Sequence, residues 1–163
     1  MYKTLFVAIL FIQCLFAENL LIGKYDRIDL PQLHLENLKA KIDTGAKTSS
    51  LHCIYIEQTE DNKVIFDVLD KTHKKYKEEK YILPIKRIAT VRSSNGLVEK
   101  RYVISTEVII FDKSYDVEFT LRNRKKMDYP ILLGREFLEK GFIVDVNKQY
   151  LSFSKENNKW IQK

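Results

Sequence analysis

The chain has 163 residues, of which 45% are hydrophobic, and this suits one domain with a packed core better than two. Its formal net charge of +6 comes from lysine and arginine residues spread along the chain, without a basic helix or an RNA-binding motif. We therefore expect no nucleic-acid partner, whereas an acidic substrate, an anionic lipid surface or plain solubility accounts for the charge.

The first seventeen residues differ from the remainder. Lys3 precedes a nearly unbroken apolar run, residues 5–17, which ends at the small residue Ala17. A basic start followed by a short apolar segment is typical of a secretory signal peptide, and the run is shorter than the roughly 20 residues of a membrane span. We predict that residues 1–17 are cleaved and that residues 18–163 form one domain exported to the periplasm. An uncleaved leader that anchors the protein in a membrane is the alternative.

The cysteine content fits an exported domain without disulfide bonds. Removal of the leader takes away Cys14 and leaves Cys53 alone, so no intrachain disulfide can form. No catalytic partner motif surrounds Cys53, and we expect it to be a small core residue.

The exported part has the sequence pattern of a mostly β protein. Short runs rich in Ile, Val, Tyr and Phe recur between turn signals, and in residues 115–121 the odd-numbered side chains share one face. The predicted strands are residues 20–30, 38–42, 50–57, 64–69, 81–83, 85–91, 98–110, 115–121 and 150–153. This pattern predicts an all-β domain.

Two segments differ from this pattern. Residues 59–80 are highly charged around an apolar centre, and they predict a long surface hairpin or insertion. Residues 134–141 lie between two glycines and predict a short helix, with Phe137 and Leu138 turned inward, ahead of a last strand in "FIVDV".

A turn signal stands between the predicted strands 85–91 and 98–110. Ser94 is followed by Asn95-Gly96, and Asn-Gly between two β-like runs is a strong signal for a tight hairpin. The hairpin is either plain architecture or a mobile cover over a cleft.

The stretch "AKIDTGAKTSS", residues 40–50, has three readings: a catalytic carboxylate loop, the end of a phosphate-binding loop, or an ordinary turn. The phosphate-binding loop fails on spacing because Lys41 and Ala46 stand where glycines are needed, so we expect no ATP site. Zinc hydrolysis lacks its signature, since the three histidines lie far apart without a His-Glu-x-x-His motif. We expect no metal and no other cofactor, and we expect His52 to be a packed or site-lining residue.

A second feature separates the catalytic loop from the ordinary turn. In residues 130–153, bulky aliphatic residues precede Gly134, a helix-forming segment and a closing strand. In this order, with the Asn-Gly hairpin between, the sequence resembles the retropepsin-like aspartic peptidases. It is most similar to a bacterial branch, commonly described as ATP-dependent zinc proteases, through "KAKIDTGAKTSSLH", "RSSNGLVEKRYVI" and "ILLGREFLEKGFIVDV". These motifs span residue 39 to about residue 153.

The resemblance implies a single-domain closed β-barrel with one short C-terminal helix and an aspartic endopeptidase activity. That chemistry uses a water activated by one carboxylate while a neighbouring carboxylic acid polarises the peptide carbonyl. Because the chain holds one Asp-Thr-Gly, a symmetric homodimer is implied, with Asp43 of each subunit at the two-fold axis. Asp43 would be the acid/base, Thr44 would brace the loop across the dimer, and Gly45 would allow a tight backbone approach.

The resemblance also implies a substrate-binding surface, with the flap tip at residues 93–96. The expected residues are Ala46, Lys47, Thr48, Arg92, Ser93, Ser94, Asn95, Gly96, Arg101, Leu132, Leu133 and Gly134. The chain departs from the retroviral enzymes at Lys47, where those have acidic residues. Together with Lys41, Arg92 and Arg101, this lysine leads us to expect a preference for acidic peptides, unless these side chains face solvent.

Two other functions stay open at this point. One is a non-catalytic domain of the same fold that binds peptides or acts as a scaffold. The other is a hydrolase of an unusual amide, such as polyglutamate or a cell-wall peptide, through the same paired carboxylates.

Overall fold

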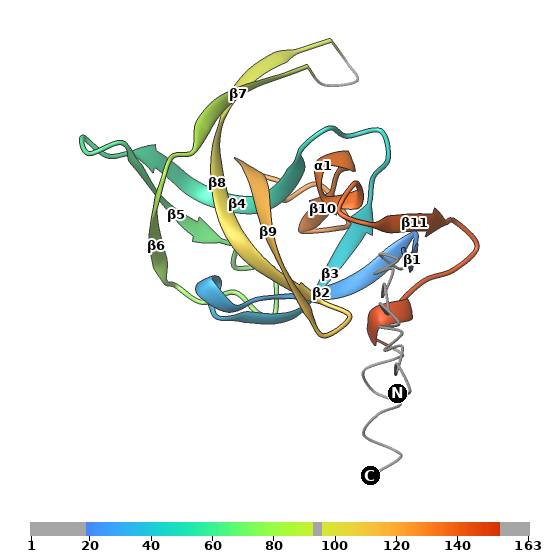
Figure 1. The fold of residues 1–163 in the computed structure, drawn as a ribbon. Coiled ribbons are helices and arrows are strands. Elements are labelled where there is room, and N and C mark those ends of the chain that lie inside the picture. Colours follow the sequence, from blue (N-terminus) through green and yellow to red (C-terminus); the bar gives the residue numbers. More distant parts are fainter. Residues whose placement is uncertain (1–18, 93–95, 154–163) are drawn as a thin grey trace, which may run out of the picture.

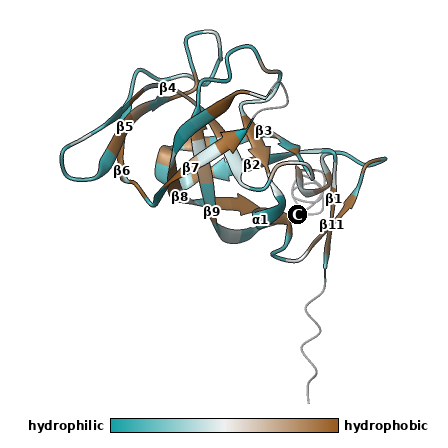
Figure 2. Cartoon of the chain, turned by 90° about the horizontal axis from the view of Figure 1, so that it is seen from above, coloured by the Kyte–Doolittle hydropathy of each residue, from teal (hydrophilic) through white to brown (hydrophobic). Residues whose placement is uncertain are grey.

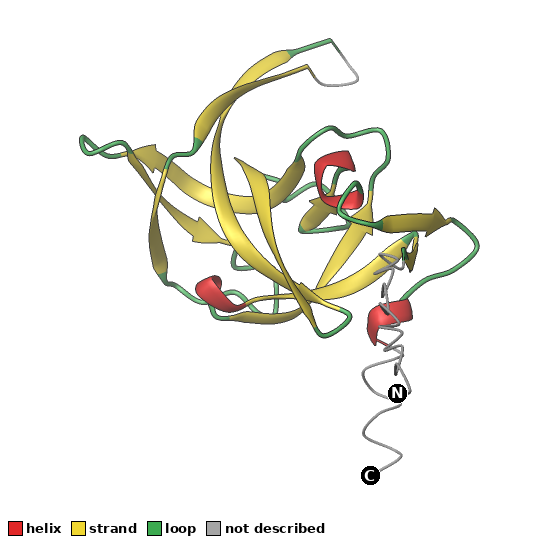
Figure 3. Ribbon diagram, viewed as in Figure 1, coloured by secondary structure: helices red, strands yellow, loops and turns green. Residues whose placement is uncertain are grey.

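The computed structural model describes residues 19–92 and 96–153, which form a β-barrel with short helices (Figures 1 and 3). The strands are β1 (Leu20–Gly23), β2 (Tyr25–Leu30), β3 (Leu35–Ile42), β4 (Ser49–Gln58), β5 (Lys63–Val68), β6 (Lys80–Pro84), β7 (Arg87–Arg92), β8 (Val98–Ile110), β9 (Lys113–Arg122), β10 (Ile131–Leu133) and β11 (Phe142–Asp145). The helical elements are η1 (Pro31–Leu33) and α1 (Arg135–Leu138), and residues 151–153 are also helical.

Six strands close the barrel in the order β10-β3-β2-β8-β9-β4, and β10 pairs again with β4. β5 and β6 continue the sheet from β4, and β7 pairs with β8 to form a hairpin that extends beyond the barrel (Figure 1). β1 and β11 form a separate parallel pair. The arrangement confirms the predicted all-β, retropepsin-like barrel.

The core lies inside the barrel and beneath α1. Figure 2 shows hydrophobic residues concentrated on the strands and hydrophilic residues on the connecting loops. Phe137 is fully buried and stacks on Phe142 of β11, with ring centroids 4.6 Å apart, while Tyr115 of β9 meets it edge-on at 5.7 Å. Leu138 and the free thiol of Cys53 are buried as predicted. These contacts attach the C-terminal part of the chain to the barrel.

The predicted strand 20–30 was wrong in its continuity. The strand is interrupted at Lys24, whose N–H donates to the carbonyl of Lys148 at 2.9 Å. As a result, β1 and β2 belong to different sheets. A Cβ on Gly23 would lie 2.4 Å from the Lys148 carbonyl carbon, so glycine permits this crossing of two backbones.

The predicted strand 150–153 was also wrong, because residues 151–153 are helical. Asp26, buried at the start of β2, accepts hydrogen bonds from the backbone N–H groups of Ser152 at 3.0 Å and Phe153 at 3.3 Å. A carboxylate that binds the free N–H groups of a first helical turn acts as a cap. A partner about 126 positions away therefore overrides the local β pattern.

Residues 59–80 are only partly the surface segment that we predicted. The hairpin between β4 and β5 exists, but β5 is an integral strand in which Val64 and Phe66 are fully buried. The charged remainder forms the connection from β5 to β6. The insertion hypothesis is therefore wrong for the apolar centre of the segment.

Two predictions fall on residues that the structure does not describe. β7 and β8 pair from Arg87↔Val103 to Arg92↔Val98, as a hairpin requires, but residues 93–95 at its tip lie outside the described ranges. The proposed leader also lies outside them, in residues 1–18. Within the described ranges, no helix combines the length and apolar character needed to cross a membrane.

Candidate active site

The loop of residues 43–48 joins β3 to β4, and β10 inserts between those two strands. Leu133 pairs with Ile42 in parallel, while Leu132 pairs with Ser50 in antiparallel orientation. At the loop entrance, the N–H of Asp43 donates to the carbonyl of Leu133 at 2.9 Å. At its exit, the N–H of Gly134 donates to the hydroxyl of Ser49 at 3.1 Å. Both ends of the loop are therefore fixed by one strand.

The start of α1 holds the middle of the loop. The backbone N–H groups of Arg135 and Glu136 donate to the carbonyls of Ala46 at 2.9 Å and Lys47 at 3.0 Å. The Arg135 guanidinium Nη1 donates to the carbonyls of Thr44 and Gly45, each at 3.0 Å. Four successive loop carbonyls thus accept hydrogen bonds from two residues, which leaves the loop little conformational freedom.

Two glycines permit this close packing. A Cβ on Gly134 would lie 2.9 Å from the Lys47 carbonyl oxygen and the Thr48 carbonyl carbon, and both are backbone atoms. A Cβ on Gly45 would lie 3.3 Å from Oδ1 of Asp43. A side chain at Gly134 would therefore displace the loop, and one at Gly45 would crowd the carboxylate.

Asp43 is half-buried, and its carboxylate is oriented by the loop itself. Its Oδ1 accepts hydrogen bonds from the backbone N–H groups of Gly45 at 3.1 Å and Ala46 at 3.3 Å. Thr44, the other polar residue of the motif, is exposed. A carboxylate held in one orientation at the edge of a cleft is suited to general acid–base chemistry.

Asp43 borders a cleft of about 980 Å³ whose lining is rich in positive charge. The cationic residues among its described lining are Lys41, Lys47, Arg87, Arg92, Arg101, Arg122 and Arg124. The carboxylates among them are Asp43 and Asp128. Such an excess of cations in a concave site attracts acidic ligands.

Six of the residues that we predicted to bind substrate line this cleft, and so does Lys41. The six are Ala46, Lys47, Thr48, Arg92, Arg101 and Leu132. Leu133 and Gly134 are buried behind the loop and support it instead. Gly96 lies beside the undescribed tip with a φ of 83°, while Ser93, Ser94 and Asn95 lie outside the described residues.

Sequence reasoning missed three arginines of the cleft: Arg87, Arg122 and Arg124. Arg122 and Arg124 follow Thr120 at alternate positions, and Thr120 lines the cleft together with these two arginines. The period-2 spacing in "TLRNR" was the available signal. Burial, together with the charges of nearby Arg122 and Arg101, lowers the pKa of the Arg124 guanidinium to about 10, while Asp43 acts in the opposite direction. Arg124 stays protonated at neutral pH.

The same cleft has an aromatic side. Tyr25 and Tyr129 stack with ring centroids 4.7 Å apart and an interplanar angle of 12°, and both residues line the cleft. The hydrogen bond between the two side chains, aided by burial, raises the pKa of Tyr129 to about 12. The cleft therefore offers a neutral aromatic surface beside its cationic groups.

His52 supports the cationic wall of the cleft, which consists of Arg87, Arg92, Arg101, Arg122 and Arg124. Its Nδ1 accepts a hydrogen bond from the backbone N–H of Arg124 at 2.8 Å, and its Nε2 lies 2.9 Å from Oδ2 of Asp70. Because Nδ1 accepts, Nε2 carries the proton and donates to Asp70. His52 is thus the packed residue that we predicted. Over residues 19–92 and 96–153, no group of three or more His, Cys, Asp and Glu could hold a metal.

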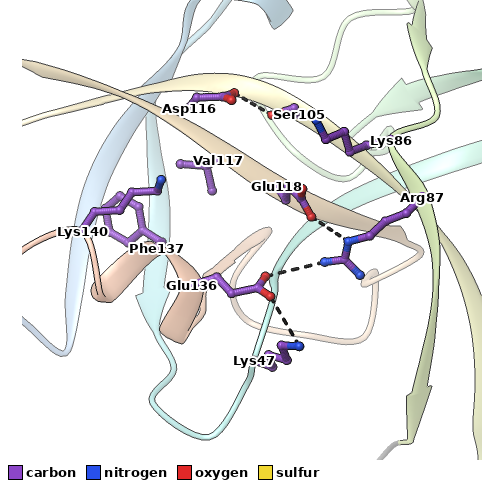
Figure 4. A pocket seen from close by; sticks show the side chains of 10 residues that line it. All are labelled: Lys47, Lys86, Arg87, Ser105, Asp116, Val117, Glu118, Glu136, Phe137 and Lys140. Carbon is purple, nitrogen blue, oxygen red and sulfur yellow. Dashed lines mark hydrogen bonds and ion pairs between the residues drawn. The ribbon is translucent and has the colours of Figure 1, made fainter.

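A second cavity, of about 530 Å³, shares Arg87 and Lys47 with the cleft as lining residues (Figure 4). Arg87 Nε lies 2.8 Å from Oε2 of Glu118, and its Nη2 lies 3.7 Å from Oε2 of Glu136. Lys47 Nζ lies 3.8 Å from Oε1 of Glu136. These ion pairs connect the base of β7 with α1 and the loop.

Known proteins resemble this chain over most of its length. The sequence model described as "RimB-like: Retropepsin-like aspartic endopeptidase RimB" matches residues 21–162. A solved structure, the protein Lpg0085 of unknown function from Legionella pneumophila subsp. pneumophila str. Philadelphia 1, has a TM-score of 0.69 and 27% sequence identity. That similarity covers 83% of this chain and 99% of the Legionella chain.

Longer proteins also contain a similar segment. A protein named "Probable alpha-L-glutamate ligase" from Parasynechococcus marenigrum (strain WH8102) is 33% identical over 132 residues, which are 79% of this chain and 28% of that protein. A protein of the same name from Shewanella halifaxensis (strain HAW-EB4) is 33% identical over 140 residues, covering 82% of this chain and 30% of that protein. This chain therefore spans less than a third of the length of these relatives.

Proposed function

The chain belongs to the RimB-like family of retropepsin-like aspartic endopeptidases, and on that premise we propose that it cleaves acidic peptides, glutamate-rich ones above all. The observation that carries the proposal is the position of Asp43, held on a fixed loop at the edge of a cleft lined by seven cationic side chains. A carboxylate for hydrolysis and a cationic surface for an acidic chain then occur in one site.

In the proposed reaction, Asp43 from each of two copies forms a carboxyl pair. Two carboxyl groups held side by side share a proton, because the repulsion between two negative charges prevents both from being ionised together. The ionised carboxylate removes a proton from water as the oxygen attacks the peptide carbonyl, and the protonated carboxyl donates to the carbonyl oxygen. The carboxyl that received the proton from water then gives it to the nitrogen as the C–N bond breaks, and the other carboxylate takes back the hydroxyl proton as the new carboxyl group forms.

The dimer is part of this proposal. The described lining of the cleft in one chain offers only one other carboxylate, Asp128, and it lacks the Asp-Thr-Gly loop context. Thr44 is exposed beside Asp43, where its hydroxyl can reach a second copy. A symmetric pair of chains supplies the second acid with the same loop geometry as the first.

The substrate class rests on charge and on the relatives. Glutamate side chains would be attracted to the lysines and arginines of the cleft, and an extended glutamate chain would present several carboxylates along it. Relatives that share a segment with this chain are named for alpha-L-glutamate ligation, so α-linked glutamate chains are the first substrates to test. Export of the mature chain to the periplasm is a further proposal, tested by N-terminal sequencing of the protein from fractionated cells.

The decisive experiment compares the purified protein with Asp43→Asn and with Asp128→Asn, the matched change of the other cleft carboxylate. Each protein is incubated with peptides containing runs of glutamate, and with the same peptides carrying glutamine, from about pH 4 to 8. Mass spectrometry identifies the cut sites, and analytical ultracentrifugation gives the oligomeric state. We expect cleavage by the parent and by Asp128→Asn, loss of cleavage in Asp43→Asn, and activity that rises with the dimer fraction.

Two results would contradict the proposal. Equal cleavage by the parent and Asp43→Asn would place the chemistry elsewhere. Binding without cleavage by folded, dimeric parent protein would favour a peptide-binding or scaffold domain, or a different amide as substrate.

A further inference from the structure

Arg101, Arg122 and Arg124 converge on one part of the cleft. Arg101 comes from β8, whereas Arg122 ends β9 and Arg124 follows it two residues later, and all three line the cleft that Asp43 borders. Arg101 and Arg124 are each only 7% exposed. Positive charge is therefore held partly out of water at the wall of the candidate active site.

These three cations have little negative charge to balance them. Nε and Nη2 of Arg101 lie 2.8 Å and 2.7 Å from Oε2 of Glu99, and Nε of Arg122 lies 3.4 Å from the same oxygen. The Arg124 guanidinium donates from Nε to the Tyr129 carbonyl at 3.2 Å and forms no ion pair with a carboxylate among the described residues. One carboxylate thus pairs with two of the three guanidinium groups.

Glu99 differs from the arginines in its surroundings. Its side chain is 47% exposed, and its position on β8 pairs with Val91 of β7, in the hairpin that extends beyond the barrel. A partly exposed carboxylate can be replaced by another carboxylate at little cost in free energy. A buried guanidinium group, by contrast, is stabilised by a nearby anion, because its charge is partly removed from water. Arginine binds carboxylates through two parallel N–H groups, which gives such a site directional selectivity.

We propose that Arg101, Arg122 and Arg124 form the subsite for an acidic side chain of the substrate, and that Glu99 occupies this subsite in the free protein. The incoming carboxylate displaces Glu99 from Arg101 and Arg122, and the guanidinium of Arg124 is a third partner for it. This assignment rests on the proposed function for its choice of ligand. It adds the residues that select the ligand and an internal carboxylate that competes with it.

A binding experiment tests the subsite independently of turnover. Every protein carries Asp43→Asn, and a fluorescent glutamate-rich peptide is compared with its glutamine counterpart by anisotropy. We expect Arg122→Gln and Arg124→Gln each to weaken glutamate-peptide binding by about tenfold or more, with less than a twofold effect on the glutamine peptide. We expect Glu99→Gln to strengthen glutamate-peptide binding several-fold. Lys113→Gln, an exposed site on the opposite end of β9, is the control for net charge.

The outcomes separate the subsite from the peptidase proposal. Equal weakening of both peptides, or a Lys113→Gln effect as large as that of Arg124→Gln, would overturn the subsite. An unchanged affinity in Glu99→Gln would overturn the competing role of Glu99. If Arg124→Gln does not fold, Arg124→Lys keeps the charge but loses the forked geometry and should still weaken glutamate-peptide binding. Selective binding that depends on the arginines, in a protein whose parent form cleaves nothing, would support the subsite and contradict the peptidase.

Discussion

The Asp43 loop and the cationic wall that lines the same cleft are stabilised by different forces. Residues 43–48 are held by backbone hydrogen bonds from β10 and α1 and by the close approach of Gly134. The wall presents charged side chains, of which Arg101 and Arg122 share the single carboxylate of Glu99. Backbone hydrogen bonds fix geometry to within tenths of an ångström, whereas charges act over longer distances and respond to salt.

Because of this difference, the loop and the wall are suited to separate tasks. A hydrolytic carboxylate must be positioned accurately, and a fixed loop provides that. Recognition of a flexible acidic chain requires attraction that tolerates several arrangements, and a wall of cations provides that. Changes in the loop should therefore lower kcat, while changes in the wall should alter KM.

The largest effect is expected for Gly134→Ala. The new Cβ would meet backbone atoms of Lys47 and Thr48 at 2.9 Å, so the loop itself must move. We expect a loss of stability of roughly 1–3 kcal/mol and a fall in activity of more than about 100-fold. Thermal melts and peptide cleavage measure the two effects.

Gly96→Ala is the matched control for this change. Nothing lies within 4 Å of a Cβ built on Gly96, so only its φ of +83° opposes alanine, at about 1 kcal/mol. If Gly134→Ala kept the parent's stability and activity, the loop would be less tightly held than the structure indicates, and the contrast between the two regions would fail.

The second prediction removes hydrogen bonds without adding bulk. Arg135→Gln deprives the carbonyls of Thr44 and Gly45 of the guanidinium donor, while the backbone N–H of residue 135 still binds Ala46. We expect kcat to fall by about 10- to 100-fold with KM changed by less than about threefold, because the loop shifts but the wall does not.

Lys140→Gln, an exposed site shortly after α1, controls for the loss of positive charge near the loop. A rise in KM at unchanged kcat would show that Arg135 acts on the substrate rather than on the loop. Restoration of kcat by Arg135→Lys would indicate that one donor is sufficient.

The loop was predictable from sequence because its determinants are local. Asp43-Thr44-Gly45 and the Ile-Leu-Leu-Gly pattern each lie within a few residues, and the period-2 runs identified most strands of the barrel. A short motif that imposes a backbone shape needs no knowledge of distant contacts.

The wrong or missing predictions arose where contacts between residues far apart in the sequence determine the local structure. The interruption between β1 and β2 at Lys24 depends on the backbone of Lys148. The helical conformation of residues 151–153 depends on the buried carboxylate of Asp26. Likewise the sequence shows that Arg124 lies in a basic run, but only its hydrogen bonds with His52 and the Tyr129 carbonyl hold it at the cleft. The leader and the hairpin tip stay predictions, because both lie outside the described residues.

The third prediction concerns acid stability of the wall. The Thr72 hydroxyl and N–H, together with His52, lower the pKa of Asp70 from its ordinary 3.8 to about 2. Because the folded pKa lies below the unfolded one, ionised Asp70 stabilises the protein above about pH 4, and this contribution is lost as the pH falls toward 2. We expect Asp70→Asn to lower the free energy of unfolding at neutral pH by roughly 1–3 kcal/mol. The same change should make the free energy of unfolding depend less on pH between about 2 and 4.

Denaturant unfolding between pH 2 and 7 checks this, with the exposed Asp128→Asn as control. Since His52 binds both Asp70 and the backbone N–H of Arg124, a weaker pair should also raise KM for acidic peptides. Unchanged acid stability would mean that His52 and Asp70 do not support the wall.

The smallest effect is expected for Glu118→Gln, which breaks the ion pair with Arg87 in the second cavity (Figure 4). The two side chains are 39% and 30% exposed, and pairs of this kind contribute about 0–1 kcal/mol because water competes for both charges. We expect a change in unfolding free energy below about 1 kcal/mol and a change in KM below about threefold, since Arg87 keeps Glu136 and the Thr48 hydroxyl as partners. A double-mutant cycle with Arg87→Gln isolates the coupling between Arg87 and Glu118. A loss above about 2 kcal/mol would mean that the wall is as strictly positioned as the loop, and a fixed wall would favour one acidic residue at one position over tolerance for a glutamate chain.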